Sequence, residues 1–259
     1  MAPELSICIP TYNRVGYLKD LLPGLSAQID AVANGKIELV ISDNASTDGT
    51  AGYLKSVGRP HLRWWTNKSN IGGDRNFLKC IREARGEYVW LLGDDDLVPP
   101  NGVAAVADLI GTSHPDLLIA GLGDSAAVEF ADYRDFLEKR CRKNAREALA
   151  HTLISANVFR REVFDMAFAE KTLYTQYAHM FGLVKDLEGT VVVTRPFVGT
   201  RPVRAEFAKY PSFLCVKQAF YLRYLARRFS VPRFNWFAFM NACNLPFEFG
   251  SRIRRRLVR

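Results

Sequence analysis

The chain has 259 residues, of which 48% are hydrophobic and 24% are charged, so it can bury the core of one large domain, or of one domain with an appendage. No apolar run reaches the roughly 18–20 residues of a transmembrane helix, and we expect no signal peptide in the opening MAPELSICIP. The five cysteines and four histidines are scattered, which argues against a zinc site and favours reduced thiols in a cytosolic protein.

The net charge of +8 is distributed unevenly along the sequence. Residues 201–259 contain 13 Lys and Arg against 2 Asp and Glu, whereas residues 1–200 contain 22 against 25. The last segment also holds 13 of the 31 aromatic residues. The composition therefore predicts a mildly acidic body followed by a basic, aromatic segment.

The first half of the sequence alternates short apolar runs with segments of helical periodicity. The expected strands lie at residues 4–9, 36–42, 61–67 and 86–92. The expected helices lie at 15–29, where Pro23 can kink or divide the helix, at 51–57, at 70–84 after a glycine loop, and at 101–112. This alternation indicates an α/β fold with a single Rossmann-like, mostly parallel sheet and flanking helices.

The second half has a less regular pattern. We expect a strand at 115–121, a charged helix at 132–150, a strand that runs into a helix at 151–164, and one or two strands at 189–202. From about residue 206 the pattern becomes that of amphipathic helices. The sequence thus predicts one domain at 1–205 and a helical C-terminal segment at 206–259.

Polar stretches follow three of the expected strands, at 11–14, 43–48 and 93–96. The carboxyl ends of parallel strands meet at one edge of an open sheet, where ligands bind. In the last stretch, Asp94, Asp95 and Asp96 follow an apolar strand and a glycine. Such carboxylates are either hydrated turn and cap residues or ligands of Mg²⁺ or Mn²⁺ beside substrate phosphates. Their place at the end of a strand favours the metal.

Four segments carry a resemblance to a known family: LSICIPTYNRVGYL, IELVISDNASTDGT, NKSNIGGDRN and ARGEYVWLLGDDDLVPP. In this order and spacing they resemble the nucleotide-binding half of family 2 glycosyltransferases, over residues 4–110. The later LISANVFRREVF, YTQYAHM and GTVVVTRPFV are similar to the abequosyltransferase-like branch of short bacterial enzymes. The resemblance implies the glycosyltransferase A fold, with a nucleotide-binding half at 1–110 and an acceptor half at 111–205.

The resemblance also implies roles for single residues. Asp95 matches the metal-binding aspartate of an Asp-X-Asp-type motif, which serves catalysis, and Asp94 matches its neighbour at the ribose or metal. Gly93 stands where relatives often have aspartate, which leaves Asp96 as a candidate second ligand. Asp43 matches the aspartate that hydrogen-bonds the base, usually uracil. The expected nucleotide-binding residues are Pro10, Thr11, Tyr12, Arg14, Asp43, Asn70, Gly73, Arg75 and Asp94, and the expected metal ligands are Asp94, Asp95 and Asp96.

Chemistry explains these residue types independently of the resemblance. A divalent ion that bridges diphosphate oxygens neutralises the charge that develops as a glycosidic bond breaks. Backbone N–H groups at the helix start near Gly73 favour an anion, and Tyr12 can pack against a base. Taken alone, IGGD is also a common turn, and DNASTDGT is also a helix start capped by Ser46 or Asp48.

The catalytic base is harder to assign. Inverting members of the family carry a Glu-Asp pair or an aspartate that deprotonates the acceptor hydroxyl, but the corresponding AEKTLYTQYAHMFG contains no such pair. His179 is the nearest candidate and titrates near neutral pH; Glu170 and Asp165 are alternatives. His179 can equally be a helix residue that packs beside Tyr177. We expect the acceptor over Asn157, Tyr177 and His179.

The C-terminal segment pairs arginines with aromatic residues, as in FYLRYLARRF, PRFNWFAFM and SRIRRRLVR. Such helices can lie in the headgroup region of an anionic membrane. The alternative is that the aromatic side chains pack onto the domain and the arginines keep it soluble. We expect no nucleic-acid partner, because the body is acidic.

The sequence therefore predicts a metal-dependent glycosyltransferase, inverting by family default. It would move a sugar from a nucleoside diphosphate sugar, first of all a UDP-sugar, to a hydroxyl of a bacterial surface glycan such as O-antigen. The acceptor would be linked to a polyprenyl diphosphate, and the protein would be peripheral on the cytoplasmic face of the plasma membrane. The alternatives are a non-catalytic sugar-nucleotide- or lipid-binding subunit and a nucleotidyltransferase, although PTYNR stands where the latter needs a GxGTR loop.

Overall fold

The computed structural model describes residues 2–32, 35–121, 126–136, 139, 154–164, 166–172 and 189–200. Apart from residues 134–136 and 139, these belong to one compact unit that comprises Met1–Tyr133 and His151–Arg201. The segment 206–259 and the residues Asp165, Tyr177 and His179 lie outside the described residues, so the predictions made for them stay predictions.

Strands and helices alternate over the first half of this unit. The strands are β1 (Leu5–Thr11), β2 (Ile37–Asp43), β3 (Leu62–Thr66), β4 (Tyr88–Leu91), β5 (Asp96–Leu97), β6 (Leu117–Ala120), β7 (Val128–Phe130), β8 (Asn157–Arg160), β9 (Val191–Thr194) and β10 (Gly199–Thr200). The helices are α1 (Val15–Val32), α2 (Thr50–Val57), α3 (Gly73–Glu83), α4 (Gly102–Ser113), α5 (Tyr133–Phe136) and α7 (Met166–Thr172), and two 3₁₀ turns are η2 (Ile154–Ala156) and η3 (Arg161–Val163).

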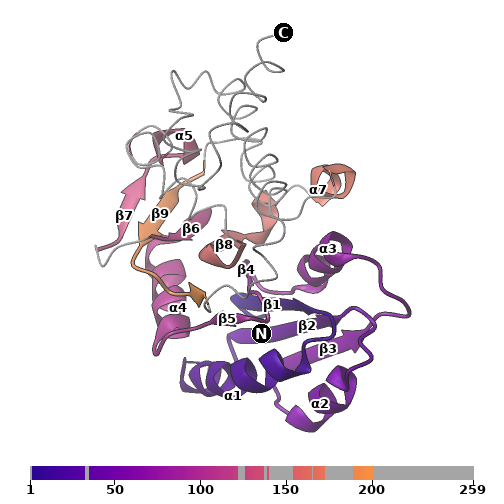
Figure 1. Ribbon diagram of the computed structural model, residues 1–259. Coiled ribbons are helices and arrows are strands. Elements are labelled where there is room, and N and C mark those ends of the chain that lie inside the picture. Colours follow the sequence, from indigo (N-terminus) through magenta and orange to yellow (C-terminus); the bar gives the residue numbers. More distant parts are fainter. Residues whose placement is uncertain are drawn as a thin grey trace, which may run out of the picture. The chain divides into compact units, whose positions relative to one another are not determined.

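The described strands form an eight-stranded sheet in the order β3-β2-β1-β4-β8-β6-β9-β7 and a two-stranded ribbon of β10 and β5. Strands β3, β2, β1 and β4 run parallel and lie side by side (Figure 1). In the second half of the sheet, β8 runs antiparallel to β4 and β6, and β7 runs antiparallel to β9. The sheet is therefore parallel where the nucleotide-binding half was predicted and mixed beyond it.

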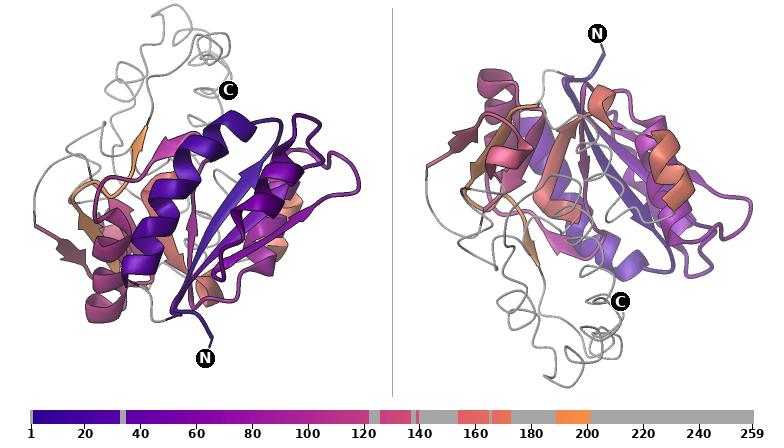
Figure 2. Two further views of the ribbon diagram at one scale, coloured as in Figure 1. Left: turned by 90° about the horizontal axis from the view of Figure 1, so that it is seen from below. Right: turned by 90° about the horizontal axis from the view of Figure 1, so that it is seen from above.

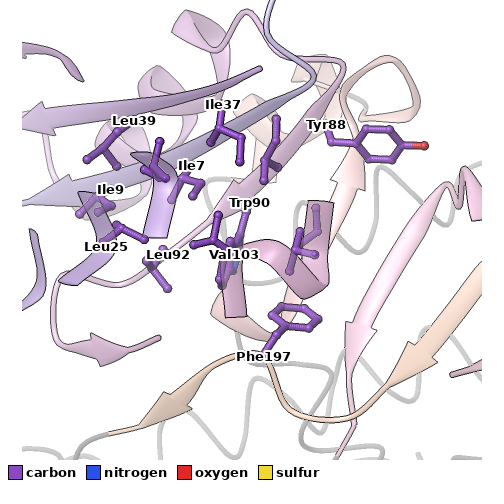
Figure 3. Close-up of a cluster of buried hydrophobic side chains, with 14 of the residues drawn as sticks. Ile7, Ile9, Leu25, Ile37, Leu39, Tyr88, Trp90, Leu92, Val103 and Phe197 are labelled. Atoms are coloured by element: carbon purple, nitrogen blue, oxygen red, sulfur yellow. The ribbon is translucent and has the colours of Figure 1, made fainter. Parts of the chain in front are cut away.

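The main core lies between the sheet and the helices α1, α2 and α4, of which α1 and α4 pack against each other (Figure 2). Alternate residues of β1, such as Ile7 and Ile9, point into this core, as do Leu39 of β2 and Trp90 of β4 (Figure 3). Leucines of α1 at helical spacing cover them; these are Leu18, Leu21, Leu22 and Leu25. Burial of this amphipathic face is what fixes α1 on the sheet.

The opposite face of the sheet carries α3, which packs on β1 and β2, with α7 beside it (Figure 2). Here the buried side chains are smaller and more polar. Cys8 and Cys80 are both buried free thiols, and each donates a weak hydrogen bond to a backbone carbonyl. Burial raises the pKa of Cys8 well above its usual value, so this thiol is an inert packing residue.

The predicted strands and helices of residues 4–121 are confirmed. Helix α1 continues through Pro23, because Pro23 lies on the exposed face, where water can satisfy the carbonyl that loses its donor. The two-residue β5 and the three-residue β7 were not predicted, whereas β9 and β10 both lie within 189–202, where one or two strands were expected. Residues 154–164 form a strand between two 3₁₀ turns rather than a strand that enters a helix. Among the described helices, none is both long and apolar enough to cross a bilayer.

Candidate active site

The polar residues that follow β1 and β4 meet at the carboxyl edge of the sheet. Cys8 of β1 pairs with Leu91 of β4. Thr11 and Asp94 each lie three residues after this pair, and their side chains are in contact. The Thr11 hydroxyl donates a hydrogen bond of 2.7 Å to Asp94 Oδ2. Both residues are buried. The register of two parallel strands therefore places the first member of the aspartate triplet.

Arg14 joins the first two aspartates. Its Nη1 atom donates to Asp94 Oδ1 at 2.8 Å and to Asp95 Oδ2 at 2.9 Å, while 37% of the arginine side chain is exposed. Burial raises the pKa of Asp94 against the attraction of Arg14 and the Thr11 hydroxyl. Burial also disfavours the charge of Arg14, but its attraction to Asp94 and Asp95 outweighs this and raises its pKa. The carboxylates of Asp94 and Asp95 thus converge on one nitrogen of Arg14 at the carboxyl edge of the sheet.

Asp96 has hydrogen-bond partners different from those of Asp94 and Asp95. Its Oδ2 atom accepts the backbone N–H of Gly93 at 3.0 Å and the hydroxyl of Ser155, and the Ser155 hydroxyl oxygen also accepts the Gly93 N–H at 3.0 Å. Burial raises the pKa of Asp96 to about 6, although the Ser155 hydrogen bond opposes the shift. Within the described residues, no group of three His, Cys, Asp or Glu side chains can hold one metal ion. Arg14 therefore joins Asp94 and Asp95, whereas Asp96 is bonded to Gly93 and Ser155.

Asp43 ends β2 at the same edge, paired with Thr11. It is 0% exposed. Its Oδ1 atom accepts the N–H of Ser46 at 3.0 Å, and its Oδ2 atom accepts the hydroxyl of Thr66 at 2.9 Å. The predicted contact with a nucleobase would have to use the remaining lone pairs of a carboxylate that already shapes its own loop.

The loop after β2 is clamped to the loop after β1. Asn13 adopts a left-handed conformation with φ of 52°. Its N–H donates to the Ser46 hydroxyl at 2.8 Å, and its side-chain oxygen accepts the Thr47 N–H at 2.7 Å. Asp48 accepts the N–H of Val15, the first residue of α1, at 2.8 Å. Asp48 therefore stabilises the start of α1 as well as that of α2, where it also accepts from Thr50.

The glycine loop before α3 is held by two asparagines: Asn70, which was expected to bind the nucleotide, and Asn44, which was not predicted. Asn44 donates to Asn70 Oδ1 at 2.9 Å and accepts the N–H of Ile71 at 2.9 Å. Asn70 Oδ1 also accepts the N–H of Gly72 at 2.8 Å, and Gly72 has φ of 86°, a conformation that favours glycine. The loop is thereby tied to the end of β2, with Gly73 exposed at the start of α3.

Several predicted residues take defined positions around this edge. Pro10 is buried in β1, Tyr12 is 43% exposed, and Arg75 is exposed in the first turn of α3. Asn157 is buried at the start of β8 and pairs with Ile119. Glu170 forms an ion pair with Arg82, which lies in the last turn of α3, at the far end of that helix from the glycine loop. This position takes Glu170 away from the aspartates.

The chain is similar in sequence to known proteins. A model of the family described as glycosyl transferase family 2 matches residues 6–168. Over 104 residues the chain is 42% identical to the abequosyltransferase RfbV of Salmonella typhimurium, a match that covers 39% of this chain and 30% of that protein. The chain thus spans about a third of the length of the curated relatives it matches.

Solved structures with a similar fold include two glycosyltransferases. A fragment of Staphylococcus aureus TarS in complex with UDP matches with a TM-score of 0.60 and 20% identity, over 90% of this chain and 74% of that one. The mannosyltransferase PcManGT of Pyrobaculum calidifontis, in complex with GDP-Man and Mn²⁺, matches with a TM-score of 0.56 and 18% identity, over 93% of this chain and 69% of that one. At these identities the likeness shows the fold.

Proposed function

The chain belongs to glycosyl transferase family 2, and from this we propose that it transfers a sugar from a nucleoside diphosphate sugar to a hydroxyl group of a bacterial surface glycan. The observation that carries the proposal is the convergence of Asp94 and Asp95 on one nitrogen of Arg14, at the carboxyl edge of the parallel strands. In open α/β sheets this edge is where ligands bind. The matched residues include all three of these side chains.

Asp94 and Asp95 fit a divalent cation. Their oxygens lie 2.8 and 2.9 Å from a single positive centre in Arg14, so both carboxylates already point to one place. Mg²⁺ is typically held by one or two carboxylates together with substrate phosphates. We assign the ion to Asp95 with Asp94 beside it. When bound, the ion would supply charge neutralisation for the leaving diphosphate.

The nucleotide would lie along the same edge. The exposed ring of Tyr12 offers a face for a base, and the exposed guanidinium of Arg75 suits a base or a phosphate. Asp43 would accept from a ribose hydroxyl or a base N–H. TarS was solved with UDP, which supports a UDP-sugar as the donor for this chain.

In the proposed reaction, the acceptor oxygen forms a bond to C1 of the sugar while the bond from C1 to the diphosphate oxygen breaks. The nucleoside diphosphate leaves with the bonding electrons, and the hydroxyl proton passes to a general base. We keep His179 as the proposed base. Displacement in line, with the acceptor opposite the leaving group, inverts the configuration at C1.

The proposal also includes the acceptor and the membrane at which the reaction takes place. A glycan carried on a polyprenyl diphosphate would bring the acceptor hydroxyl to the inner face of the plasma membrane. The Lys and Arg residues of the segment 206–259 would hold the protein at that anionic surface, where each nearby cation contributes about 1 kcal/mol. Binding to vesicles with and without phosphatidylserine, for the full chain and for the chain cut after residue 205, tests this part.

Turnover tests the proposal as a whole. The full chain would be incubated with Mn²⁺, a panel of nucleotide sugars and a polyprenyl-diphosphate-linked glycan, and release of free nucleoside diphosphate would be followed together with mass change of the acceptor. We expect one donor to give both signals. Donor binding without any acceptor-dependent release would favour instead the non-catalytic binding subunit, which the missing Glu-Asp pair also supports.

A further inference from the structure

We infer that Asp96 is a positioning residue that, together with Ser155, fixes the turn carrying Asp94 and Asp95, and that it is not a ligand of the metal. This inference rests on the proposed function, since it concerns how the same site is held. It divides the aspartate triplet into two residues that face the ligand and one that faces the protein.

The Asp96 side chain supports this inference through its hydrogen bonds. Oδ2 accepts from the Gly93 backbone and from the Ser155 hydroxyl, so it closes a small ring of hydrogen bonds across the turn. Arg14 contacts Asp94 and Asp95, and no ion pair between Arg14 and Asp96 occurs among the described residues. Arg14 therefore pairs with Asp94 and Asp95 but not with Asp96.

The second support is the anchoring of Ser155 itself. The indole N–H of Trp90, at 0% exposure, donates to the Ser155 carbonyl at 2.9 Å. The Trp90 ring also packs edge-on against Phe197, with 5.3 Å between ring centroids. Ser155 is thus fixed by the core just before β8 begins, and it can serve as a firm point of attachment for the turn after β4.

The third support is the backbone on the far side of the turn. Asp96 and Leu97 form β5, which pairs with Thr200 and Gly199 of β10. The main chain of Asp96 is therefore held by β10 while its side chain is held by Ser155. Asp94 and Asp95 therefore lie between Gly93, whose N–H is bonded to Ser155, and Asp96, which is held by β10 and Ser155.

Gly93 completes the arrangement. A Cβ atom at this position would lie 2.6 Å from Asp96 Oδ2 and 3.2 Å from Asp95 Oδ1. An aspartate at position 93 would displace the carboxylate of Asp96 from its present place. The absence of a side chain at Gly93 therefore leaves room for the Asp96 carboxylate in its hydrogen-bonded position.

Manganese binding separates the two roles of Asp96. The full chain and its Asp96→Asn, Asp96→Ala and Asp95→Asn variants would be titrated with Mn²⁺ in the presence of UDP, and free Mn²⁺ would be measured by electron paramagnetic resonance. In Asp96→Asn the introduced amide oxygen can still accept from Gly93 and Ser155, so we expect the Kd to stay within about threefold of wild type. We expect Asp96→Ala to weaken binding by roughly 10–100-fold, as loss of an outer-sphere partner does, and Asp95→Asn to abolish it.

Ser155→Ala has a matched control in the same fold. Ser6 also bridges a glycine N–H and a carboxylate: it accepts from Gly86 at 2.8 Å and donates to Glu38 at 2.6 Å, but it lies near the start of β1. Each Ser→Ala variant removes one hydrogen bond from a glycine N–H and one to a carboxylate, and both variants are expected to lower the melting temperature. Only Ser155→Ala should weaken Mn²⁺ binding, by about tenfold or more.

The outcomes distinguish this inference from the proposed function. If Asp96→Asn loses Mn²⁺ as completely as Asp95→Asn, Asp96 is a ligand and the inference is wrong. If wild type itself binds no Mn²⁺ with any nucleotide, the proposed function fails instead. Hydrogen exchange at the Gly93 amide then decides the inference: it should become faster in Asp96→Ala and Ser155→Ala but not in Asp96→Asn, and unchanged exchange in Asp96→Ala would overturn it.

Discussion

The two ends of the sheet each hold buried carboxylates beside an arginine, but they satisfy them differently. At the amino end, Glu38 accepts from the Ser6 hydroxyl at 2.6 Å, the Arg85 N–H at 2.7 Å and Arg63 at 2.7 Å. Burial opposes its ionisation, but these hydrogen bonds outweigh it and lower the pKa of Glu38. A carboxylate with this set of donors has its charge compensated within the protein and needs no ligand.

At the carboxyl end, the charges are only partly compensated. Burial raises the pKa of both Asp94 and Asp96 in spite of their partners, and the one cation in contact with Asp94 and Asp95 among the described residues is the half-buried Arg14. A further positive charge would stabilise the carboxylates of Asp94 and Asp95, whereas Glu38 already has its full set of donors. We infer from this difference that the amino end of the sheet contributes to stability and that the carboxyl end binds a ligand.

The sharpest way to break the comparison is to neutralise Asp95. We expect Asp95→Asn to lower turnover by roughly 100-fold or more, because the ion that stabilises the leaving diphosphate contributes several kcal/mol, while the free energy of unfolding without metal stays equal or rises. Initial rates and urea denaturation measure the two effects. Asp108→Asn, which removes an exposed carboxylate from α4, is the charge-matched control and should change neither.

Removing Glu38 should give the opposite pattern. Glu38→Ala removes the acceptor of the Ser6 hydroxyl and of the Arg85 N–H and the ion-pair partner of Arg63. We expect the free energy of unfolding to fall by about 2 kcal/mol. Affinity for UDP with Mn²⁺ should stay within about twofold. A loss of affinity as large as that of Asp95→Asn would contradict the assignment of this end to stability.

The pH dependence of stability should differ in sign between the two ends. The pKa of Asp96 is raised to about 6, so the folded state keeps a proton that the unfolded state releases. Its contribution therefore lowers the free energy of unfolding as pH rises from about 4 to about 6, by about 2 kcal/mol. The pKa of Glu38 is lowered, so its contribution is present above its unfolded pKa and is lost as pH falls through the folded pKa.

Denaturation curves in EDTA at a series of pH values, for wild type, Asp96→Asn and Glu38→Gln, measure these contributions. Asp96→Asn should become more stable relative to wild type as pH rises to about 6, whereas Glu38→Gln should lose its disadvantage as pH falls below about 4. Parallel curves for wild type and Asp96→Asn would show that the Asp96 carboxylate is not the buried group described above.

The smallest expected effect concerns Arg14. Arg14→Gln removes the charge between Asp94 and Asp95, and we expect a loss of about 1 kcal/mol in the free energy of unfolding without metal. Saturating Mn²⁺ and UDP should reduce this loss, because the ion then compensates the same carboxylates. Thermal unfolding with and without the ligands checks this, and a deficit that persists unchanged would count against a shared site.

Much of the fold followed from the sequence because its signals are local and periodic. The apolar runs of β1, β2 and β4 and the leucine spacing of α1 mark these elements unambiguously. The two-residue strand β5 carries no such period, and its pairing with β10 joins residues about a hundred positions apart. Short elements of this kind are set by tertiary contacts rather than by propensity.

The candidate site was predicted in its position but not in its internal arrangement. The three polar stretches after parallel strands do meet at one edge, since Thr11 reaches Asp94 and pairs with Asp43. The sequence did not separate Asp96 from its neighbours, because adjacent residues of one type look alike until their partners are known. Ser155 gave no signal at all: a single serine acquires its role only through contact with a distant turn.

The central claim is that Asp94 and Asp95 hold a divalent ion that in turn holds a diphosphate. Calorimetric titration of UDP into the full chain tests it most directly, with Mn²⁺ or with EDTA, for wild type and Asp95→Asn. We predict that wild type binds UDP at least tenfold more tightly with Mn²⁺ than with EDTA, and that Asp95→Asn shows no such difference. Equal affinity of wild type for UDP in the two conditions, or an unchanged Mn²⁺ effect in Asp95→Asn, would contradict the claim.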